Sequence, residues 1–282
     1  MKHAKLAITY TQAAPEHWTS HEGEIIVEAP VSLTVNGEVW LTFMCTPVDL
    51  EAMAIGFLYN EGVISSMEEV ASVFLCATGD NVDVWLHYAA EKPEKWRRTS
   101  GCTGGFTAVE EGAAIYPPVN GVVLAASNVT GLIAQLFEAQ QLYRESGGVH
   151  TSGLSDGQRI VFVAEDIGRH NTLDKLAGRY LIEGLHLQRK VILTTGRISS
   201  EMLQKSARIG AGILVSRTSP SSLSIETAER LGITLIGYAR RNRFNIYTHP
   251  ERIIPSDSLY SNIAQEPDTA ALAREIINNK IT

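Results

Sequence analysis

Residues 191–216 have the sequence VILTTGRISSEMLQKSARIGAGILVS, and this stretch contains the pattern that decides the fold. Val191–Thr195 and Ile213–Ser216 are short apolar runs without alternation, which is typical of strands buried on both faces. Between them, Ser199–Ile209 opens on a capping serine and carries apolar residues at helical spacing. A strand, a helix and a strand in this order predict a right-handed crossover between parallel strands.

The same pattern continues on both sides of this stretch. Two more unalternating apolar runs lie at Ile160–Ala164 and Thr234–Gly237. Two more capped helical stretches lie at Asn171–Glu183, where Asn171 to Asp174 has the form of a capping box, and at Ser221–Leu231. We therefore predict an α/β domain with a mainly parallel sheet over residues 126–282.

The N-terminal part of the chain, residues 1–125, instead shows short alternating runs. Glu24–Thr34 and Val39–Phe43 flank Asn36-Gly37, a dipeptide that strongly favours a two-residue hairpin turn. A second hairpin is predicted where Ser72–Ala77 is followed by Val82–Tyr88. This pattern predicts a smaller α+β region with antiparallel hairpins.

One helix is expected within this N-terminal region. Thr46 followed by Pro47 has the form of a helix start, and Leu50, Met53 and Phe57 follow at helical spacing towards Gly62. Further along the chain, Glu91–Thr107 shows neither helical nor strand periodicity and predicts a long mobile loop. Loops of this length inside compact domains are usually functional.

Gly112–Phe137 carries no charge and has the length of a membrane span. Pro117, Pro118 and Gly121 interrupt it, so we expect a loop followed by a helix that ends at Gly147-Gly148. The N-terminus lacks the apolar run of a signal peptide, and no membrane association is predicted. We expect a cytoplasmic protein.

The amino-acid composition limits the classes of protein to which this chain can belong. Hydrophobic residues make up 44% and charged residues 20% of the 282 residues, as in ordinary globular proteins. The net charge of −7 argues against a nucleic-acid-binding surface over the whole molecule. The three cysteines form no CxxC pair, which argues against a disulfide scaffold or a structural metal site.

Four loops are expected to meet where the strands of the α/β domain end, because ligand sites in such sheets lie beyond the carboxyl ends of the strands. These loops are 165–170, 196–198, 217–220 and 239–243, and they bring six arginines to one edge of an acidic protein. Three of them lead into helix N-termini, which favour anions. The pattern predicts a phosphate-bearing ligand of nucleotide size; alternatively, individual arginines pair with surface acids.

Several enzyme classes lack their motifs here. Neither a Walker loop nor a GxGxxG after a strand is present, which removes support for an NTPase or a dinucleotide-dependent dehydrogenase. His-x-Glu occurs only at His249-Pro250-Glu251, and PCxxC is absent, so a zinc deaminase is excluded. The GxSxG of a serine hydrolase is also missing.

Cys102 is the one cysteine in a setting that favours reactivity. It lies among glycines, a few residues after Arg97 and Arg98, and positive charge favours the thiolate. Cys45 and Cys76 lie in or beside apolar runs and are expected to be structural. Asp166, Arg169 and His170 suggest a proton-handling cluster, with the capping box as the alternative. His150, after Gly147-Gly148, is either functional or a satisfied core histidine.

These residues resemble a known family, the formate dehydrogenase accessory sulfurtransferases of the FdhD or NarQ type. The resemblance extends over nearly the whole chain and is carried by several stretches in family order, among them VEAPVSLTVNGE (27–38), SGGVH (146–150) and VAEDIGRHNTLDKLAG (163–178). It implies a cytidine deaminase-like fold for the larger domain, without the zinc ligands of that enzyme.

The resemblance also implies a function. Family members are understood to take sulfur from a cysteine desulfurase as a persulfide and to pass it to the bis(molybdopterin guanine dinucleotide) cofactor of formate dehydrogenase. Cys102 is the implied persulfide cysteine, although Gly105 stands where many members have a second cysteine. The alternative is a chaperone that binds the molybdenum cofactor without catalysis. A homodimer is left open, and no structural metal is expected.

The expected binding site for the cofactor, or for a guanine nucleotide as its fragment, combines the family segment with the loops described above. It consists of Tyr238, Ala239, Arg240, Arg241, Asn242, Arg243, Arg197, Arg217, Arg169 and His170.

Overall fold

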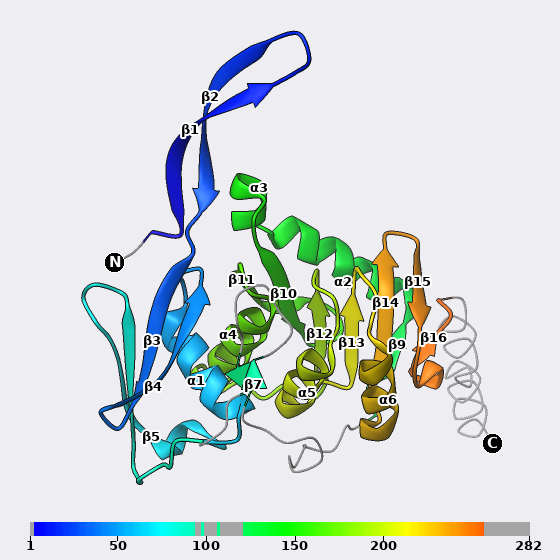
Figure 1. Ribbon diagram of the computed structural model, residues 1–282. Helices are drawn as coiled ribbons and strands as arrows, with labels where there is room; N and C mark the ends of the chain where they lie inside the picture. Colours follow the sequence, from blue (N-terminus) through cyan, green and yellow to red (C-terminus); the bar gives the residue numbers. More distant parts are fainter. Residues whose placement is uncertain (1–2, 94–96, 99–105, 108–120, 257–282) are drawn as a thin grey trace, which may run out of the picture.

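The structure is a computed structural model that describes residues 3–93, 97–98, 106–107 and 121–256. Its body contains a four-stranded sheet from the first third of the chain and a six-stranded sheet from the second half, with helices between them (Figure 1). Within the described part, no helix is long and apolar enough to span a membrane. The mixed α/β architecture agrees with the predicted fold class.

The four-stranded sheet contains both predicted hairpins. Its strands, in the spatial order β4-β3-β6-β5, are β3 (Ala29–Val35), β4 (Glu38–Cys45), β5 (Val70–Leu75) and β6 (Asn81–Leu86). Asn36 and Gly37 have φ angles of 50° and 83°, the left-handed values that a tight two-residue hairpin turn requires. The predicted turn is therefore confirmed.

The first helix, α1 (Leu50–Asn60), begins later than predicted. Thr46 does not cap it; its backbone N–H instead donates to Asp166 Oδ2, 3.0 Å away, in the second half of the chain. Asp49, with a φ of 50°, is the residue before the helix. The helix ends where expected, because Gly62, just beyond its last turn, has a left-handed φ of 76°.

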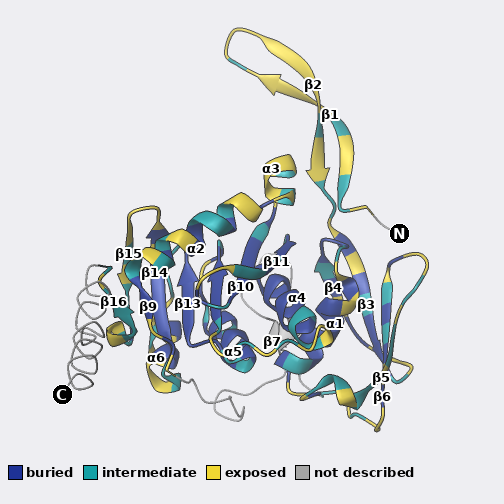
Figure 2. Ribbon diagram, turned by 180° about the vertical axis from the view of Figure 1, so that it is seen from behind, coloured by how far each residue is buried: buried dark blue, intermediate teal, exposed yellow. Residues whose placement is uncertain are grey.

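The N-terminal hairpin was not predicted. β1 (Lys5–Ala13) and β2 (Trp18–Ile26) pair antiparallel along their whole length and stand out from the body (Figures 1 and 2). We call residues 5–26 the arm. Glu24–Thr34 was predicted as one alternating run, but the chain leaves β2 at Ile26 and starts β3 at Ala29.

The six-stranded sheet is mixed, and the prediction of a mainly parallel sheet holds only for its centre. β12 (Val191–Thr194), β13 (Ile213–Ser216) and β14 (Thr234–Arg240) pair in parallel, as the crossover helices require. The other three pairings, β10–β11, β10–β12 and β14–β15, are antiparallel. The remaining strands are β10 (His150–Ser155), β11 (Ile160–Asp166) and β15 (Arg243–Ile246).

Helices cover both faces of this sheet. On one face, α4 (Arg169–Ile182), α5 (Ser200–Ile209) and α6 (Ser222–Leu231) enclose a core. The other face carries α2 (Ala126–Ala139), followed by the short α3 (Leu142–Ser146). The predicted single helix up to Gly147 is thus two helices.

Two of the three predicted caps are confirmed. Ser199 and Ser221 accept hydrogen bonds from the backbone N–H groups of Met202 and Ser224. The capping box at Asn171 is wrong, because α4 already begins at Arg169 and the Asn171 side chain donates to the Asp166 carboxylate and to the Met44 carbonyl.

The two halves of the chain meet where α1 packs against α4. At Gly56 a Cβ would lie 1.7 Å from the carbonyl oxygen of Asp174, and at Gly178 a Cβ would lie 1.8 Å from that of Ala52. Only glycine permits so close an approach of two helix backbones.

The predicted division at residues 125 and 126 stays a prediction. Short elements complete the described chain: η1 (Met67–Glu69), β7 (Arg97–Arg98), β8 (Phe106–Thr107), β9 (Leu124–Ala125), η2 (Pro250–Arg252) and β16 (Ile253–Ile254). β9 pairs in parallel with β16 near the C-terminal end of the described residues.

Candidate functional site

Four strands end at the same edge of the six-stranded sheet. β12, β13 and β14 are parallel, and β11 runs in their direction because both β11 and β12 are antiparallel to β10, which lies between them. The predicted convergence of the four loops is therefore confirmed, although one antiparallel strand separates the first loop from the others.

Hydrogen bonds tie these loops to one another. Ile198 accepts from Ser221 N at 3.0 Å, and Ser216 Oγ donates to the carbonyl oxygen of Gly196 at 2.7 Å. Tyr238 N donates to the carbonyl oxygen of Thr218 at 3.0 Å. Since the loops after β12, β13 and β14 support one another, the backbone of this part of the edge is held in place before any ligand arrives.

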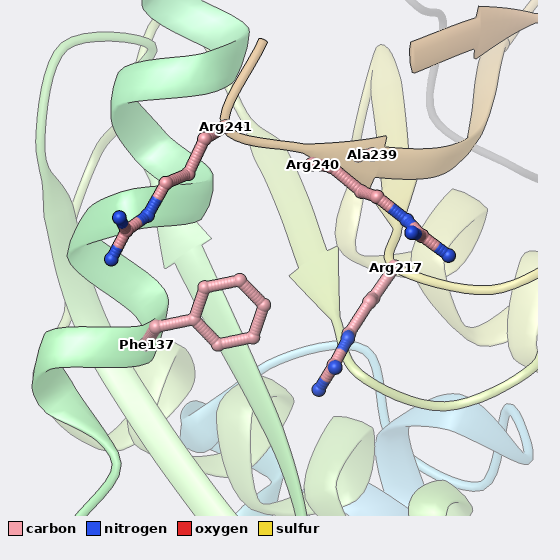
Figure 3. A pocket seen from close by; sticks show the side chains of 5 residues that line it. All are labelled: Phe137, Arg217, Ala239, Arg240 and Arg241. Carbon is pink, nitrogen blue, oxygen red and sulfur yellow. The ribbon is translucent and has the colours of Figure 1, made fainter. Parts of the chain in front are cut away.

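Three of the predicted arginines line one hollow. The Phe137 hollow has a volume of about 350 Å³ and is lined by Phe137, Arg217, Ala239, Arg240 and Arg241. Figure 3 shows Phe137 of α2 flanked by Arg241 and Arg217. The Arg217 guanidinium lies 5.3 Å from the centroid of the Phe137 ring, a cation–π contact that orients it.

A second hollow lies on the same hairpin and shares Arg240 with the first. The Tyr238 hollow has a volume of about 290 Å³ and is lined by Tyr238, Arg240, Arg243 and Asn245. One extra residue on β14 between the pairs Gly237–Asn245 and Arg240–Arg243 makes a bulge. Tyr238 in this bulge has a φ of 50° and is 44% exposed, so its ring is presented to solvent.

Gly237 explains how the bulge fits against the neighbouring loop. A Cβ at this position would lie 3.0 Å from both Pro220 Cδ and the carbonyl oxygen of Thr218. The close approach allows β14 to pass the Arg217–Pro220 loop and brings Arg217 beside Arg240.

Near the start of α4 lies a third group, the histidine–arginine cluster of His150, Arg169, His170 and Arg197. Burial lowers the pKa of His150, and the charges of Arg169 and Arg197 lower it further. Burial, together with Lys205 and Arg169, holds the pKa of His170 well below its ordinary value. Both imidazoles are therefore neutral near pH 7 and can take up a proton when an anion binds.

Contacts inside this cluster are close. A Cβ at Gly196 would lie 3.1 Å from Arg169 Cβ and 3.5 Å from His150 Nδ1. His170 Nε2 lies 3.4 Å from the hydroxyl of Ser199, the cap of α5. The structure thus brings the predicted Arg169, His170 and Arg197 together and adds His150 from β10.

The contacts of the Asp166 carboxylate indicate a structural role. Its Oδ1 accepts from Gly168 N at 2.7 Å and from Asn171 Nδ2 at 2.9 Å, and its Oδ2 accepts from Thr46 N at 3.0 Å and from Lys175 Nζ at 2.7 Å. With four donors on a fully buried carboxylate, Asp166 holds the loop before α4 and does not support the predicted proton-handling role.

The predicted catalytic residue Cys102 lies outside the described residues. The strands on either side of it, β7 and β8, pair antiparallel. Cys45 is fully buried and donates to the carbonyl oxygen of Ala29, which confirms its structural character.

Cys76 is not the apolar core residue that was predicted. It lies at the start of the β5–β6 turn, and its sulfur accepts from Asn81 N at 3.1 Å and from Asp80 N at 3.4 Å. The Asp80 carboxylate opposes ionisation, but the Thr78 hydroxyl and the two backbone N–H groups outweigh it and lower the pKa of the Cys76 thiol.

Sequence reasoning missed three residues of the site. Asn245 lies on β15, a strand that was not predicted. Phe137 lies on α2, which precedes all strands of the six-stranded sheet in the sequence, so none of the predicted loops contains it. His150 was noted in its motif but not assigned. Among residues that the structure describes, no three His, Cys, Asp or Glu side chains form a metal-binding group.

A comparison with protein families decides where this chain belongs. The model of the FdhD/NarQ family matches residues 26–254. The chain belongs to the FdhD/NarQ family. All three cationic groups on the sheet edge fall inside the matched region of this FdhD/NarQ chain, whereas almost all of the arm precedes it.

Individual relatives agree. The sulfur carrier protein FdhD of Staphylococcus aureus strain MRSA252 is 35% identical over 244 residues, which covers 83% of this FdhD/NarQ chain and 91% of the relative. The protein of the same name from strain bovine RF122 / ET3-1 is 35% identical over 240 residues, with the same coverage. A crystal structure from Desulfotalea psychrophila, described as that of a formate dehydrogenase accessory protein, superimposes with a TM-score of 0.76 at 30% identity and covers 89% of this chain and 100% of that one.

Proposed function

We propose that this chain is a sulfur carrier that serves a formate dehydrogenase. Relatives that share a third of its residues are named sulfur carrier proteins, and the similar crystal structure is described as that of a formate dehydrogenase accessory protein. The observation on this chain that carries the proposal is the arginine-rich sheet edge, which fits a large anionic cofactor. A cytoplasmic location remains part of the proposal.

The two hollows fit the two chemical parts of a nucleotide. Arg217, Arg240 and Arg241 present guanidinium groups to the Phe137 hollow, where they suit phosphate oxygens. The exposed ring of Tyr238 suits a stacked base, and the Asn245 amide and the arginines offer hydrogen-bond donors around it. Adjacent donors favour guanine, whose O6 and N7 are both acceptors, over adenine, which presents an amino group there.

The substrate in this proposal is the bis(molybdopterin guanine dinucleotide) cofactor of the client enzyme. Its phosphates would lie on Arg217, Arg240 and Arg241, and the histidine–arginine cluster would bind further anionic groups along the same edge. Because His150 and His170 are neutral without a ligand, binding of an anion beside them is accompanied by proton uptake.

Cys102 is the sulfur-carrying residue in this proposal. Its thiolate attacks the outer sulfur of a persulfide on a cysteine desulfurase, the bond between the two desulfurase sulfurs breaks, and the desulfurase cysteine leaves as a thiolate. In delivery, the acceptor supplies the electron pair for its new bond to the outer sulfur, and Cys102 is released as a thiolate. No second thiol in the carrier is needed.

The intact mass of the full chain tests this proposal after incubation with a cysteine desulfurase and cysteine. We expect one added sulfur, removed by a reducing agent and lost in Cys102→Ala. Cys45→Ala serves as the matched control and should still gain sulfur, since Cys45 is fully buried. An unmodified wild-type chain, or a Cys102→Ala chain that still gains the sulfur, would contradict the proposed role of Cys102.

The second candidate is a cofactor-binding chaperone. The residues that line the two hollows do not include Cys102, so binding of a cofactor at this edge does not require that thiol. The two candidates differ in one result. If Cys102→Ala restores formate dehydrogenase activity in cells that lack the wild-type protein, the chaperone is supported and the sulfur carrier is not.

A further inference from the structure

Two helix N-termini meet at the histidine–arginine cluster. α4 begins at Arg169 and has 14 residues, and α5 begins at Ser200 and has 10 residues. The two ends touch where His170 Nε2 lies 3.4 Å from the hydroxyl of Ser199, the cap of α5. The first N–H groups of a helix have no partner within the helix and carry a partial positive charge. Two such ends at one place favour an anion.

Side chains add positive charge to these helix ends. Arg197, in the loop after β12, is exposed and forms no ion pair with a carboxylate in the part of the chain that the structure describes. A Cβ at Gly196 would lie 3.2 Å from Arg169 Cδ and 3.5 Å from His150 Nδ1. Because glycine has no Cβ, Arg169 and His150 both lie against this stretch of backbone, next to Arg197.

The other charged groups around the cluster are already engaged. The charged residues that act on its two histidines are Arg169, Arg197, Asp166 and Lys205. Asp166 accepts four hydrogen bonds, and Lys205 is paired with Asp174 at 2.6 Å. Glu201, in the first turn of α5, forms no ion pair with another described residue. The charge of Arg197 and of the two helix ends is therefore open to an added anion.

This cluster is separate from the two hollows. It lies where α4 and α5 begin, and these helices cover one face of the six-stranded sheet, whereas the Phe137 hollow includes a residue of α2 on the other face (Figure 1). The cluster shares no residue with either hollow. The residues that line the hollows include no histidine, carboxylate or cysteine, so an anion that binds there does so without a proton.

We propose that the histidine–arginine cluster is a second anion site, which binds one tetrahedral oxoanion of charge −2 together with a proton on His150. His150 is the less buried of the two histidines and lies beside the exposed Arg197. A dianion there favours the imidazolium form and so opposes the effect of the two arginines. Its oxygens accept from the guanidinium, the imidazolium and the helix ends at once. The assignment goes beyond the proposed function, because it holds whether or not the chain carries sulfur.

Calorimetry with sulfate tests the proposal on the full chain. Sulfate stays a dianion near neutral pH, so any proton taken up on binding belongs to the protein. Titrations in two buffers of different ionisation enthalpy measure this uptake. We expect sulfate to bind with proton uptake and its affinity to fall as the pH rises, by at most about tenfold per pH unit for one proton. Arg197→Gln should abolish this proton-linked binding, and His150→Gln should abolish the proton uptake.

Two control variants and one competitor separate this site from the hollows. Arg240→Gln, at the residue common to both hollows, and His186→Gln, at an exposed histidine, should both keep proton-linked sulfate binding. A chain saturated with GDP should also keep it. Sulfate that does not bind, binds without a proton, or is displaced by GDP would overturn the proposal, as would proton-linked binding that survives in Arg197→Gln. Failure of GDP to bind would contradict the nucleotide site alone and leave the sulfate result intact.

Discussion

Lys175 Nζ lies 2.7 Å from Asp166 Oδ2, and both side chains are completely shielded from solvent. The ammonium group also donates to the carbonyl oxygens of Thr46 and Glu165, both 3.1 Å away. Through Thr46, this ion pair connects the end of β4, an edge strand of the N-terminal sheet, to the loop that precedes α4. The pair therefore joins the two halves of the chain beside the candidate site.

Removal of the Lys175 charge is expected to destabilise the protein strongly. Lys175→Met leaves the Asp166 carboxylate buried without its cation, which costs about 3–5 kcal/mol. Urea unfolding measures the loss, and Lys92→Met, which removes an ion pair of 3.6 Å at the surface, is the control with an expected change below about 1 kcal/mol. If Lys175→Met alone leaves the free energy of unfolding unchanged, or if adding Asp166→Asn does not recover the lost stability, the Lys175–Asp166 pair does not join the two halves of the chain.

The contact between α1 and α4 predicts a sharp contrast between glycines. Gly56→Ala or Gly178→Ala places a methyl group within 2 Å of a carbonyl oxygen in the facing helix. We expect losses at or above the upper end of about 1–3 kcal/mol. Gly131→Ala in α2 is the control: nothing lies within 4 Å of its Cβ position, and the substitution should stabilise by about 0.5–1 kcal/mol. Equal effects at all three positions would contradict the packing.

Stability should fall in mildly acidic solution because of the histidine–arginine cluster. The pKa values of His150 and His170 are depressed in the folded protein, so between the unfolded value of 6.5 and the lower folded values the unfolded chain binds more protons. Their contribution is complete above pH 6.5 and is lost as the pH falls towards the folded values.

Thermal unfolding between about pH 7.5 and about pH 5.5 measures this effect, because these values lie about one unit on either side of the ordinary histidine pKa. His170→Gln should flatten the pH dependence, and His186→Gln, which replaces an exposed histidine, serves as the control variant. An unchanged slope in His170→Gln would show that His170 is not held neutral.

Arg240 is the residue common to both hollows, so its replacement should affect nucleotide binding most. We expect GDP to bind, with an affinity that falls as salt rises, and Arg240→Lys to weaken it about tenfold, or about 1.4 kcal/mol, because the planar fork is lost while the charge is kept. Arg243→Lys should weaken binding less. Arg230→Lys on α6 is the exposed control, and calorimetry is the measurement. Tolerance of both pocket variants would place the nucleotide elsewhere.

The strands that sequence reasoning predicted are those whose own residues are apolar, such as β12 and β13. β10 was missed because Thr151, Ser152 and Ser155 are buried polar residues. Ser152 Oγ bonds to the hydroxyls of Thr172 and Thr194, which lie 20 and 42 residues further along the chain. Burial of such groups depends on partners that no local pattern reveals.

The residues of the candidate site also divide into those that the sequence could predict and those that it could not. Arg217 and Arg240 could be predicted because each follows or ends an apolar strand, and the carboxyl ends of parallel strands meet. Asn245 could not, because only the β14–β15 hairpin, with its bulge at Tyr238, carries it to the Tyr238 hollow. The arm was missed because its weak alternation continues without a break into β3.

The cysteines provide the last prediction, because Cys45 and Cys76 turn out to have opposite environments. The Asp80 carboxylate opposes ionisation of Cys76, but the Thr78 hydroxyl and the backbone N–H groups of Asp80 and Asn81 outweigh it and lower the pKa of this partly exposed thiol. Cys45, by contrast, is fully buried in the core. Iodoacetamide should therefore alkylate Cys76 in the native chain much faster than Cys45, since the thiolate is the reactive form. Cys45→Ala should cost about 1 kcal/mol in urea unfolding, and Cys76→Ser much less.

A reactive Cys76 need not carry sulfur. Gly105 stands where a second loop cysteine would be, so a mechanism with two thiols would have to use Cys76 or Cys45. We expect Cys76→Ser to gain and deliver sulfur like the wild type, because transfer of the outer persulfide sulfur needs one thiol in the carrier. Intact mass and activation of the client dehydrogenase are the two measurements. If Cys76→Ser accepts sulfur but cannot deliver it, while the folded Cys45→Ala delivers normally, Cys76 takes part in transfer and the single-cysteine mechanism is wrong.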